Sequence, residues 1–232
     1  DLPPGWVTAL DLPLIPGVPV YGPPYALRHI ARRLEEHQQK ADLRPTRVGQ
    51  SIGVGAFEVE PIRVNHSIPD ATGLILRTPA GVVVHSGDFK IERDPVDKLA
   101  FDADRLRKAG DEGVRLLLSD STNVDVPGRA GEERLVTDEL DILVRDAKQR
   151  ICVAVFASNV HRLNAVILAA KKHRRKICLL GRSLDNHAAV SRELGPIPPA
   201  DALFVSPEMA RSVPRNELIV VATGTQGEAA AA

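Results

Sequence analysis

Two side chains that can bind a metal ion, His66 and Asp88, lie close to the ends of predicted strands. Strands are predicted at 59–64, 73–77 and 82–85, and the turn at 79–81 makes the last two a β-hairpin. An imidazole and a carboxylate are nitrogen and oxygen ligands that zinc accepts. The spacing predicts a metal-binding rim, although a histidine capping a turn and an aspartate in a Gly-Asp turn explain the same residues.

A second acidic residue, Asp120, follows the predicted strand 114–118 within the sequence S-D-S-T-N. Open α/β folds place their ligands at the carboxyl ends of strands, so a strand that ends in small polar residues indicates a functional edge. A plain Asx or Ser turn is the alternative interpretation of this segment.

From residue 132 onward, helices and strands alternate, which predicts right-handed crossovers and a mainly parallel sheet. Helices are predicted at 132–148, 159–172, 184–194 and 207–212, and strands at 151–156, 177–180 and 217–222. Ser158 and Ser183 then lie near helix N-termini, where free N–H groups and the helix dipole favour a phosphate. His161, Arg162 and Arg182 add charge beside them, while serines acting only as N-caps remain an alternative.

The one dense basic cluster is K-K-H-R-R-K at 171–176, which is either a solvated helix end or a contact for an RNA backbone. Lys+Arg and Asp+Glu both number 30, so any nucleic-acid binding requires a local basic patch. With 232 residues and 44% hydrophobic content, the chain can form one large core or two modest ones.

The cysteines, Cys152 and Cys178, each lie in an apolar strand-like run, and both are predicted to be buried. Neither belongs to a C-x-x-C pair, so a disulfide framework or a cysteine-based zinc site is not expected and a reducing cytoplasm is the natural setting. No apolar run has the length of a membrane span, and no signal peptide is evident.

Six motifs occur in a fixed order along the chain: N-H-S-I-P-D-A at 65–71, H-S-G-D-F-K at 85–90, L-L-L-S-D-S-T-N at 116–123, F-A-S-N-V-H-R at 156–162, G-R-S at 181–183 and T-G-T-Q-G-E at 223–228. Together they resemble ribonuclease J, of the metallo-β-lactamase/β-CASP nucleases. The resemblance implies an α/β fold with a metallo-β-lactamase-like αββα sandwich portion at 1–130. An inserted β-CASP domain with a mainly parallel sheet is implied at 131–232.

The resemblance also implies roles for individual residues. His66 would bind one metal ion, Asp88 would bridge two, and Asp120 would act from behind the metal site. Residues that would bind the RNA strand are Ser158, Asn159, His161, Arg162, Arg182 and Ser183. Zinc is the implied metal, with manganese as an alternative, and the implied partner is 5′-monophosphorylated single-stranded RNA in the cytoplasm. A homo-oligomer is compatible with this family.

The sequence departs from the family pattern at its start, where residues 1–6 stand in place of a His-x-His-x-Asp-His motif and contain no histidine. Two later family histidines, a presumed general acid and a last metal ligand, are also absent. Two main hypotheses follow: a metal-dependent ribonuclease, or a degenerate homologue that binds RNA or a nuclease partner without hydrolysis. A small-molecule hydrolase on the same scaffold is a third hypothesis.

Overall fold

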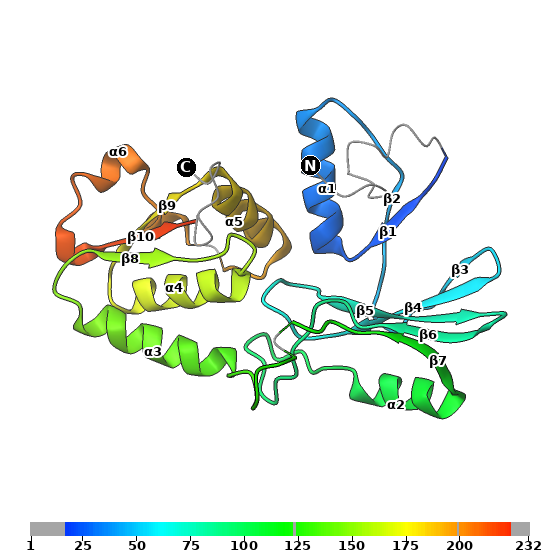
Figure 1. Cartoon of the computed structure of the whole chain (residues 1–232). Coiled ribbons are helices and arrows are strands. Elements are labelled where there is room, and N and C mark those ends of the chain that lie inside the picture. Colours follow the sequence, from blue (N-terminus) through cyan, green and yellow to red (C-terminus); the bar gives the residue numbers. More distant parts are fainter. Residues whose placement is uncertain (1–16, 123, 199, 224–232) are drawn as a thin grey trace. The chain divides into compact units, whose positions relative to one another are not determined.

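The computed structural model describes residues 17–122, 124–198 and 200–223. Its contacts divide the chain into two compact units (Figure 1). The first unit consists of Asp1–Val64, Asp70–Phe89 and Phe101–Val124, and the second of Asn65–Pro69, Lys90–Ala100 and Asp125–Ala232. Two short segments therefore belong to the second unit although the chain around them belongs to the first.

The first unit begins with a small βαβ element. Strands β1 (Val20–Gly22) and β2 (Leu43–Pro45) pair in parallel, and helix α1 (Pro24–Glu36) connects them. Proline at the first helical position suits α1 because its fixed φ is already helical and its missing N–H would have no partner there. Its buried residues are Tyr25, Leu27 and Leu34, of which Leu27 and Leu34, seven residues apart, share a face.

A five-stranded sheet in the order β3-β4-β5-β6-β7 forms the main part of the first unit. Its strands are β3 (Ile52–Val54), β4 (Phe57–Arg63), β5 (Thr72–Thr78), β6 (Gly81–His85) and β7 (Val114–Leu118). The predicted hairpin is present as the antiparallel pair β5 and β6, in which Leu74 faces His85. Strand β7 pairs with β6 in parallel at the edge of the sheet, and all five of its residues are exposed.

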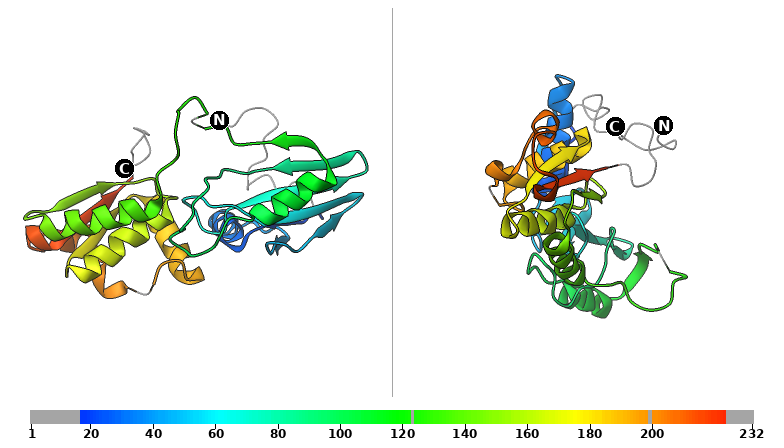
Figure 2. Two further views of the ribbon diagram at one scale, coloured as in Figure 1. Left: turned by 90° about the horizontal axis from the view of Figure 1, so that it is seen from below. Right: turned by 90° about the vertical axis from the view of Figure 1, so that its left-hand side faces the viewer.

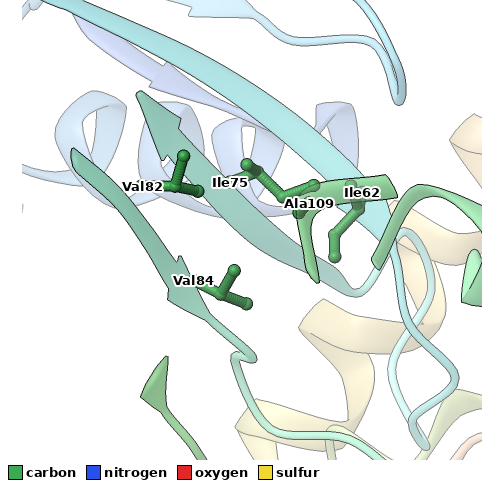
Figure 3. Packing of buried hydrophobic residues seen from close by; sticks show 5 residues of the cluster. All are labelled: Ile62, Ile75, Val82, Val84 and Ala109. Atoms are coloured by element: carbon green, nitrogen blue, oxygen red, sulfur yellow. The ribbon is translucent and has the colours of Figure 1, made fainter. Parts of the chain in front are cut away.

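Helix α2 (Ala103–Glu112) contributes to the core of this sheet, as Figure 3 shows. The buried side chains of this core are Ile62, Ile75, Val82, Val84 and Ala109. In β5 and β6 the buried residues alternate with more exposed neighbours, which is the period-two pattern of a sheet with one buried face, whereas β4 is buried at three consecutive residues, 60–62. The buried Ile75, Val82 and Val84 therefore help to fix the register of β5 against β6.

The second unit contains a three-stranded parallel sheet in the order β8-β10-β9. The strands are β8 (Ile151–Ala154), β9 (Lys176–Leu180) and β10 (Leu218–Ala222). The helices are α3 (Glu133–Asp146), α4 (Val160–Lys172), α5 (Arg182–Leu194) and α6 (Pro207–Ala210), with short 3-10 turns η2 (Asp201–Leu203) and η3 (Arg215–Glu217). This confirms the predicted alternation and the mainly parallel sheet.

Helices α3 and α4 lie side by side, as Figures 1 and 2 both show. Helix α4 carries fully buried Val160, Leu163, Val166 and Ile167, so it is one of the main contributors of apolar side chains to this unit. Its N-terminus is capped by Asn159, whose side-chain oxygen accepts the Arg162 N–H at 3.0 Å.

Only one of the two cysteine predictions is correct. Cys178 is buried, whereas Cys152 is exposed. Strand β8 lies at an edge of the three-stranded sheet and its residues alternate between half-buried and exposed, so an apolar run there does not imply full burial. Among the described residues, no helix combines the length and the apolar character that a bilayer span requires.

Core burial predicts a contrast between two isoleucines. Ile75 is 0% exposed and Ile91 is 69% exposed. We expect Ile75→Ala to lower the free energy of unfolding by about 2–5 kcal/mol, because truncation leaves a cavity in a packed core. The matched Ile91→Ala variant is expected to stay within about 0.5 kcal/mol. Urea unfolding of both variants checks this, and equal effects would contradict the described core.

Candidate nucleic-acid interface and metal-ligand residues

In the first unit, Asp120 holds the loop that carries Asp88. The Asp120 carboxylate accepts the backbone N–H of Phe89 at 3.4 Å and that of Thr122 at 2.9 Å. The Asp120 backbone N–H in turn donates to the Ser86 hydroxyl at 2.8 Å. The structure therefore brings Asp120 and the Asp88 loop together, and Asp120 acts on Asp88 through the backbone of its neighbour.

Two glycines allow this loop to lie against strand β5. A Cβ atom at Gly73 would come within 2.7 Å of the Ser86 carbonyl oxygen and within 2.9 Å of that of His85. Gly87 has a φ of +62°, and a Cβ there would meet the Thr72 carbonyl oxygen at 2.6 Å. Only glycine fits such close backbone approaches, so both glycines help to place Asp88.

In the second unit, His66 follows Asn65, whose backbone and side chain both form hydrogen bonds. Asn65 forms a β-bridge with Lys90, whose N–H donates to the Asn65 carbonyl at 2.8 Å. The Asn65 side-chain amide donates to the Leu99 carbonyl, also at 2.8 Å. His66 itself is half-buried. The segments 65–69 and 90–100 are thus held to each other.

A buried carboxylate, Glu133, joins these segments to helix α4. Glu133 is 6% exposed and accepts two hydrogen bonds from the Arg162 guanidinium, at 2.6 and 3.1 Å. Lys90 places its Nζ atom 2.7 Å from Glu92 and 3.8 Å from Glu133. The Glu92 carboxylate also accepts the Glu133 backbone N–H at 2.8 Å, which satisfies a free donor at the start of α3. The two carboxylates and two cations balance one another's charge.

His161 lies beside this network. Its Nε2 atom is 4.0 Å from the Asp97 carboxylate, and its side chain is 13% exposed. Burial lowers the pKa of His161 below its ordinary value of 6.5, and the nearby Asp97 carboxylate only partly opposes this effect. The imidazole is therefore uncharged at neutral pH and offers hydrogen bonding to a ligand in place of the predicted charge.

The remaining predicted residues lie at the carboxyl edge of the three-stranded sheet. Ser158 occupies the turn after β8, while Arg182 and Ser183 begin α5 directly after β9 and are exposed. Strands β8 and β9 flank β10, so the two turns are separated by about 10 Å, twice the strand spacing. The prediction that Ser158 and Ser183 both lie near helix starts is correct, and Asn159 rather than Ser158 is the cap of α4.

The described contacts thus form two groups. Asp88 and Asp120 belong to the first unit, and His66 belongs to the second unit together with all six predicted RNA-binding residues. No three His, Cys, Asp or Glu side chains in the described part of the chain form a metal-binding cluster. Residues 1–6, Asn123 and 224–228, which the sequence motifs also involve, lie outside the described residues.

The sequence motifs did not identify the residues that position these side chains. Ser86 lies within the motif H-S-G-D, but the hydrogen bond that its hydroxyl accepts from Asp120 depends on the parallel pairing of β6 with β7. Glu92 and Glu133 appear as ordinary surface acids in the sequence. Only the placement of α3 and α4 together makes them the buried partners of Lys90 and Arg162.

Comparison with known proteins agrees with the motifs and the fold. Residues 148–232 match the family described as "Ribonuclease J, beta-CASP domain". The chain is 41% identical over 225 residues to ribonuclease J of Synechocystis sp., covering 96% of this chain and 34% of that protein. It is 39% identical over 215 residues to ribonuclease J of Corynebacterium glutamicum, covering 93% of this chain and 30% of that protein. The chain belongs to the ribonuclease J family.

This ribonuclease J-family chain spans about a third of the length of the curated relatives it matches, such as 34% of the Synechocystis protein. Ribonuclease J of Thermus thermophilus is 36% identical over 225 residues, covering 94% of this chain and 39% of that protein. A crystal structure of a protein of unknown function from Enterococcus faecalis superposes with a TM-score of 0.63 at 17% identity, covering 89% of this chain and 53% of that chain. That structure supports the fold alone.

The Glu133 network predicts a large effect from a small substitution in this ribonuclease J-family chain. Glu133→Gln would leave Arg162 and Lys90 without their shared carboxylate. The Arg162 and Lys90 side chains are 29% and 21% exposed, so water can replace part of the lost interaction. We therefore expect the free energy of unfolding to fall by about 2–3 kcal/mol, less than for a fully buried pair. Glu139→Gln, on an exposed position of the same helix, is expected to change stability by less than about 0.5 kcal/mol.

The measurement is urea unfolding combined with amide hydrogen exchange across 90–100. Glu133→Gln should raise exchange in that segment, whereas the Glu139→Gln control should leave it unchanged. Equal stability and equal exchange in the two variants would contradict the structural role of Glu133.

The close approach at Gly73 gives a separate prediction for the Asp88 loop. Gly73→Ala forces a methyl group against two backbone carbonyls, so we expect a loss of about 1–3 kcal/mol in stability. Gly53 is a matched control in β3, because a Cβ atom there meets nothing within 4 Å. Gly53→Ala should be neutral or slightly stabilising. Chemical unfolding tests the pair, and a neutral Gly73→Ala variant would show that the loop does not lie against β5.

Proposed function

We propose that this chain forms part of a metal-dependent ribonuclease of the ribonuclease J type, which hydrolyses RNA phosphodiesters in RNA processing and decay. In this proposal residues 1–130 form a metallo-β-lactamase-like sandwich portion and residues 131–232 the β-CASP domain, and the segments 65–69 and 90–100 are grouped with the second unit. The observation that carries it is the family match, in which the motif residues occupy strand ends and helix starts.

His66 and Asp88 are the proposed metal ligands, for zinc or manganese. The support for these two ligands is their position in the motifs N-H-S-I-P-D-A and H-S-G-D-F-K. One imidazole and one carboxylate are nevertheless fewer than the three or so protein ligands that catalytic metal sites use, so the described residues do not complete a metal centre.

For the RNA strand, we propose the carboxyl edge of the sheet β8-β10-β9. Arg182 forms no hydrogen bond or ion pair within the described ranges and lies at the first residue of α5, where free N–H groups favour a phosphate. Asn159 and Arg162 are already engaged by the α4 backbone and by Glu133. In this proposal Arg182 and Ser183 contact the 5′-monophosphorylated strand, and Ser158, Asn159, His161 and Arg162 shape the neighbouring turn.

The setting that we propose is the cytoplasm, with RNA as the partner. Both cysteines are free thiols, which agrees with a reducing compartment. The second candidate function is RNA binding without hydrolysis. The absence of histidine from residues 1–6 favours it, because the family places its main metal motif there.

The decisive experiment measures bound zinc and manganese, together with decay of a 5′-monophosphorylated RNA, for the purified chain and for His66→Ala and Asp88→Ala. If both residues bind metal, each substitution should reduce metal content and slow decay by on the order of a hundredfold. Exposed His37 and Asp104 supply the matched controls His37→Ala and Asp104→Ala, which should leave both readouts unchanged.

The outcomes separate the two candidate functions. Decay that survives both His66→Ala and Asp88→Ala would overturn the metal mechanism. RNA binding without decay and without bound metal in the unsubstituted chain would favour the non-hydrolytic function.

A further inference from the structure

A basic cavity of about 540 Å³ lies in the second unit, apart from the residues proposed above to bind metal or RNA. The cationic residues that line it are Arg145, Lys148, Arg175 and Arg215, together with His173. No aspartate or glutamate is among its lining residues in the described part of the chain. Its volume falls within the range of about 300–1,000 Å³ that is typical of small-ligand sites.

The cavity lies at the amino edge of the three-stranded sheet. Arg175 directly precedes β9, Gln149 lies two residues before β8, and Asn216 lies two residues before β10. The strands are parallel, so this edge is opposite the one that carries Ser158 and Arg182. Figure 1 shows the amino ends of β8 and β10 together, near the end of α3. Strands of four or five residues separate the two edges by about 15 Å.

Three of these lining side chains have structural partners. Arg175 is 4% exposed and donates to the carbonyls of Ala147 and Gln149, just beyond α3. Arg145 pairs with Asp146 at 2.8 Å, and His173 lies 2.9 Å from Asp141. Cations at the end of a helix also balance its dipole. These contacts explain part of the basic run at 171–176 without a ligand.

Lys148 and Arg215 have no such explanation. Both are exposed, and neither forms a hydrogen bond or an ion pair within the described portion of the chain. They come from segments far apart in sequence, one after α3 and one in η3 before β10, yet they line the same cavity. Lys148, which interacts electrostatically with Asp146, and Arg215 lie beside a buried guanidinium and contribute to a positive field. The side-chain amides of Gln149 and Asn216 add hydrogen-bond donors.

We propose that this cavity binds a phosphate group, carried either by a free nucleotide or by an RNA strand, with Lys148 and Arg215 as its principal contacts. Guanidinium and ammonium groups recognise phosphate oxygens through charge-assisted hydrogen bonds. The polar lining and the absence of acidic residues from it select an anion over an apolar or cationic ligand. The proposal does not depend on hydrolysis by this chain.

The test uses the whole chain with chelator present, so that no RNA is cleaved. Binding of AMP, of inorganic phosphate and of a fluorescent single-stranded RNA is measured for the unsubstituted chain and for Lys148→Ala/Arg215→Ala. The double variant should bind at least one of these probes about tenfold more weakly, and loss of one RNA phosphate contact should lower the salt slope by about 0.7.

The matched control is Arg129→Ala/Arg211→Ala, which removes two exposed cations of the same unit that do not line the cavity. It should leave all three affinities unchanged, and the unfolding curves of both double variants should coincide with that of the unsubstituted chain. The reversal Lys148→Glu/Arg215→Glu should abolish the same binding.

Each outcome is informative about the ligand. Loss of AMP and phosphate binding alone identifies a free nucleotide as the source, and loss of RNA binding alone identifies the strand. Loss of both shows that either source is accepted. If the cavity variants bind all three probes as the control variant does, the proposal is overturned, whatever the result for His66 and Asp88.

Discussion

The carboxylate of Glu133 is the constraint on which the second unit depends. It lies at the first turn of α3, receives the Arg162 guanidinium from α4, and is approached by Lys90 from a segment 43 residues earlier in the chain. A nearly buried carboxylate is unfavourable unless it is paired and hydrogen-bonded. Its partners therefore have to be in place together, and this requirement fixes the segments 65–69 and 90–100 beside the starts of two helices.

This arrangement also assigns different tasks to residues of one motif. In S-N-V-H-R, Asn159 caps the helix, Val160 is fully buried, His161 is uncharged and nearly buried, and Arg162 is engaged by Glu133. Most of the motif thus builds the turn, whereas Arg182 and Ser183 after β9 present exposed polar groups. A family motif can therefore be a structural support for a binding edge as well as a set of ligand contacts.

Much of this fold follows from the sequence, because period-two and helical patterns are local. The hairpin β5–β6, strand β7 and the alternation from α3 to β10 all match the predicted segments within a few residues. Cys152 fails because an apolar strand does not reveal whether it lies at an edge. The Glu133 network could not be predicted, since its members are separated in sequence and look like surface charges until α3 and α4 pack. Nor do motifs reveal the cavity formed by Lys148 and Arg215.

The burial of the Glu133 network has a practical consequence for solution work. Added salt weakens attraction between exposed ions over a Debye length of about 10 Å at 0.1 M, but it acts much less on charges shielded by protein. The ion pairs around Glu133 should therefore persist at salt concentrations that weaken the binding of phosphate to exposed cationic side chains. Changes in affinity along such a titration would then report on phosphate contacts, with the scaffold beneath them intact.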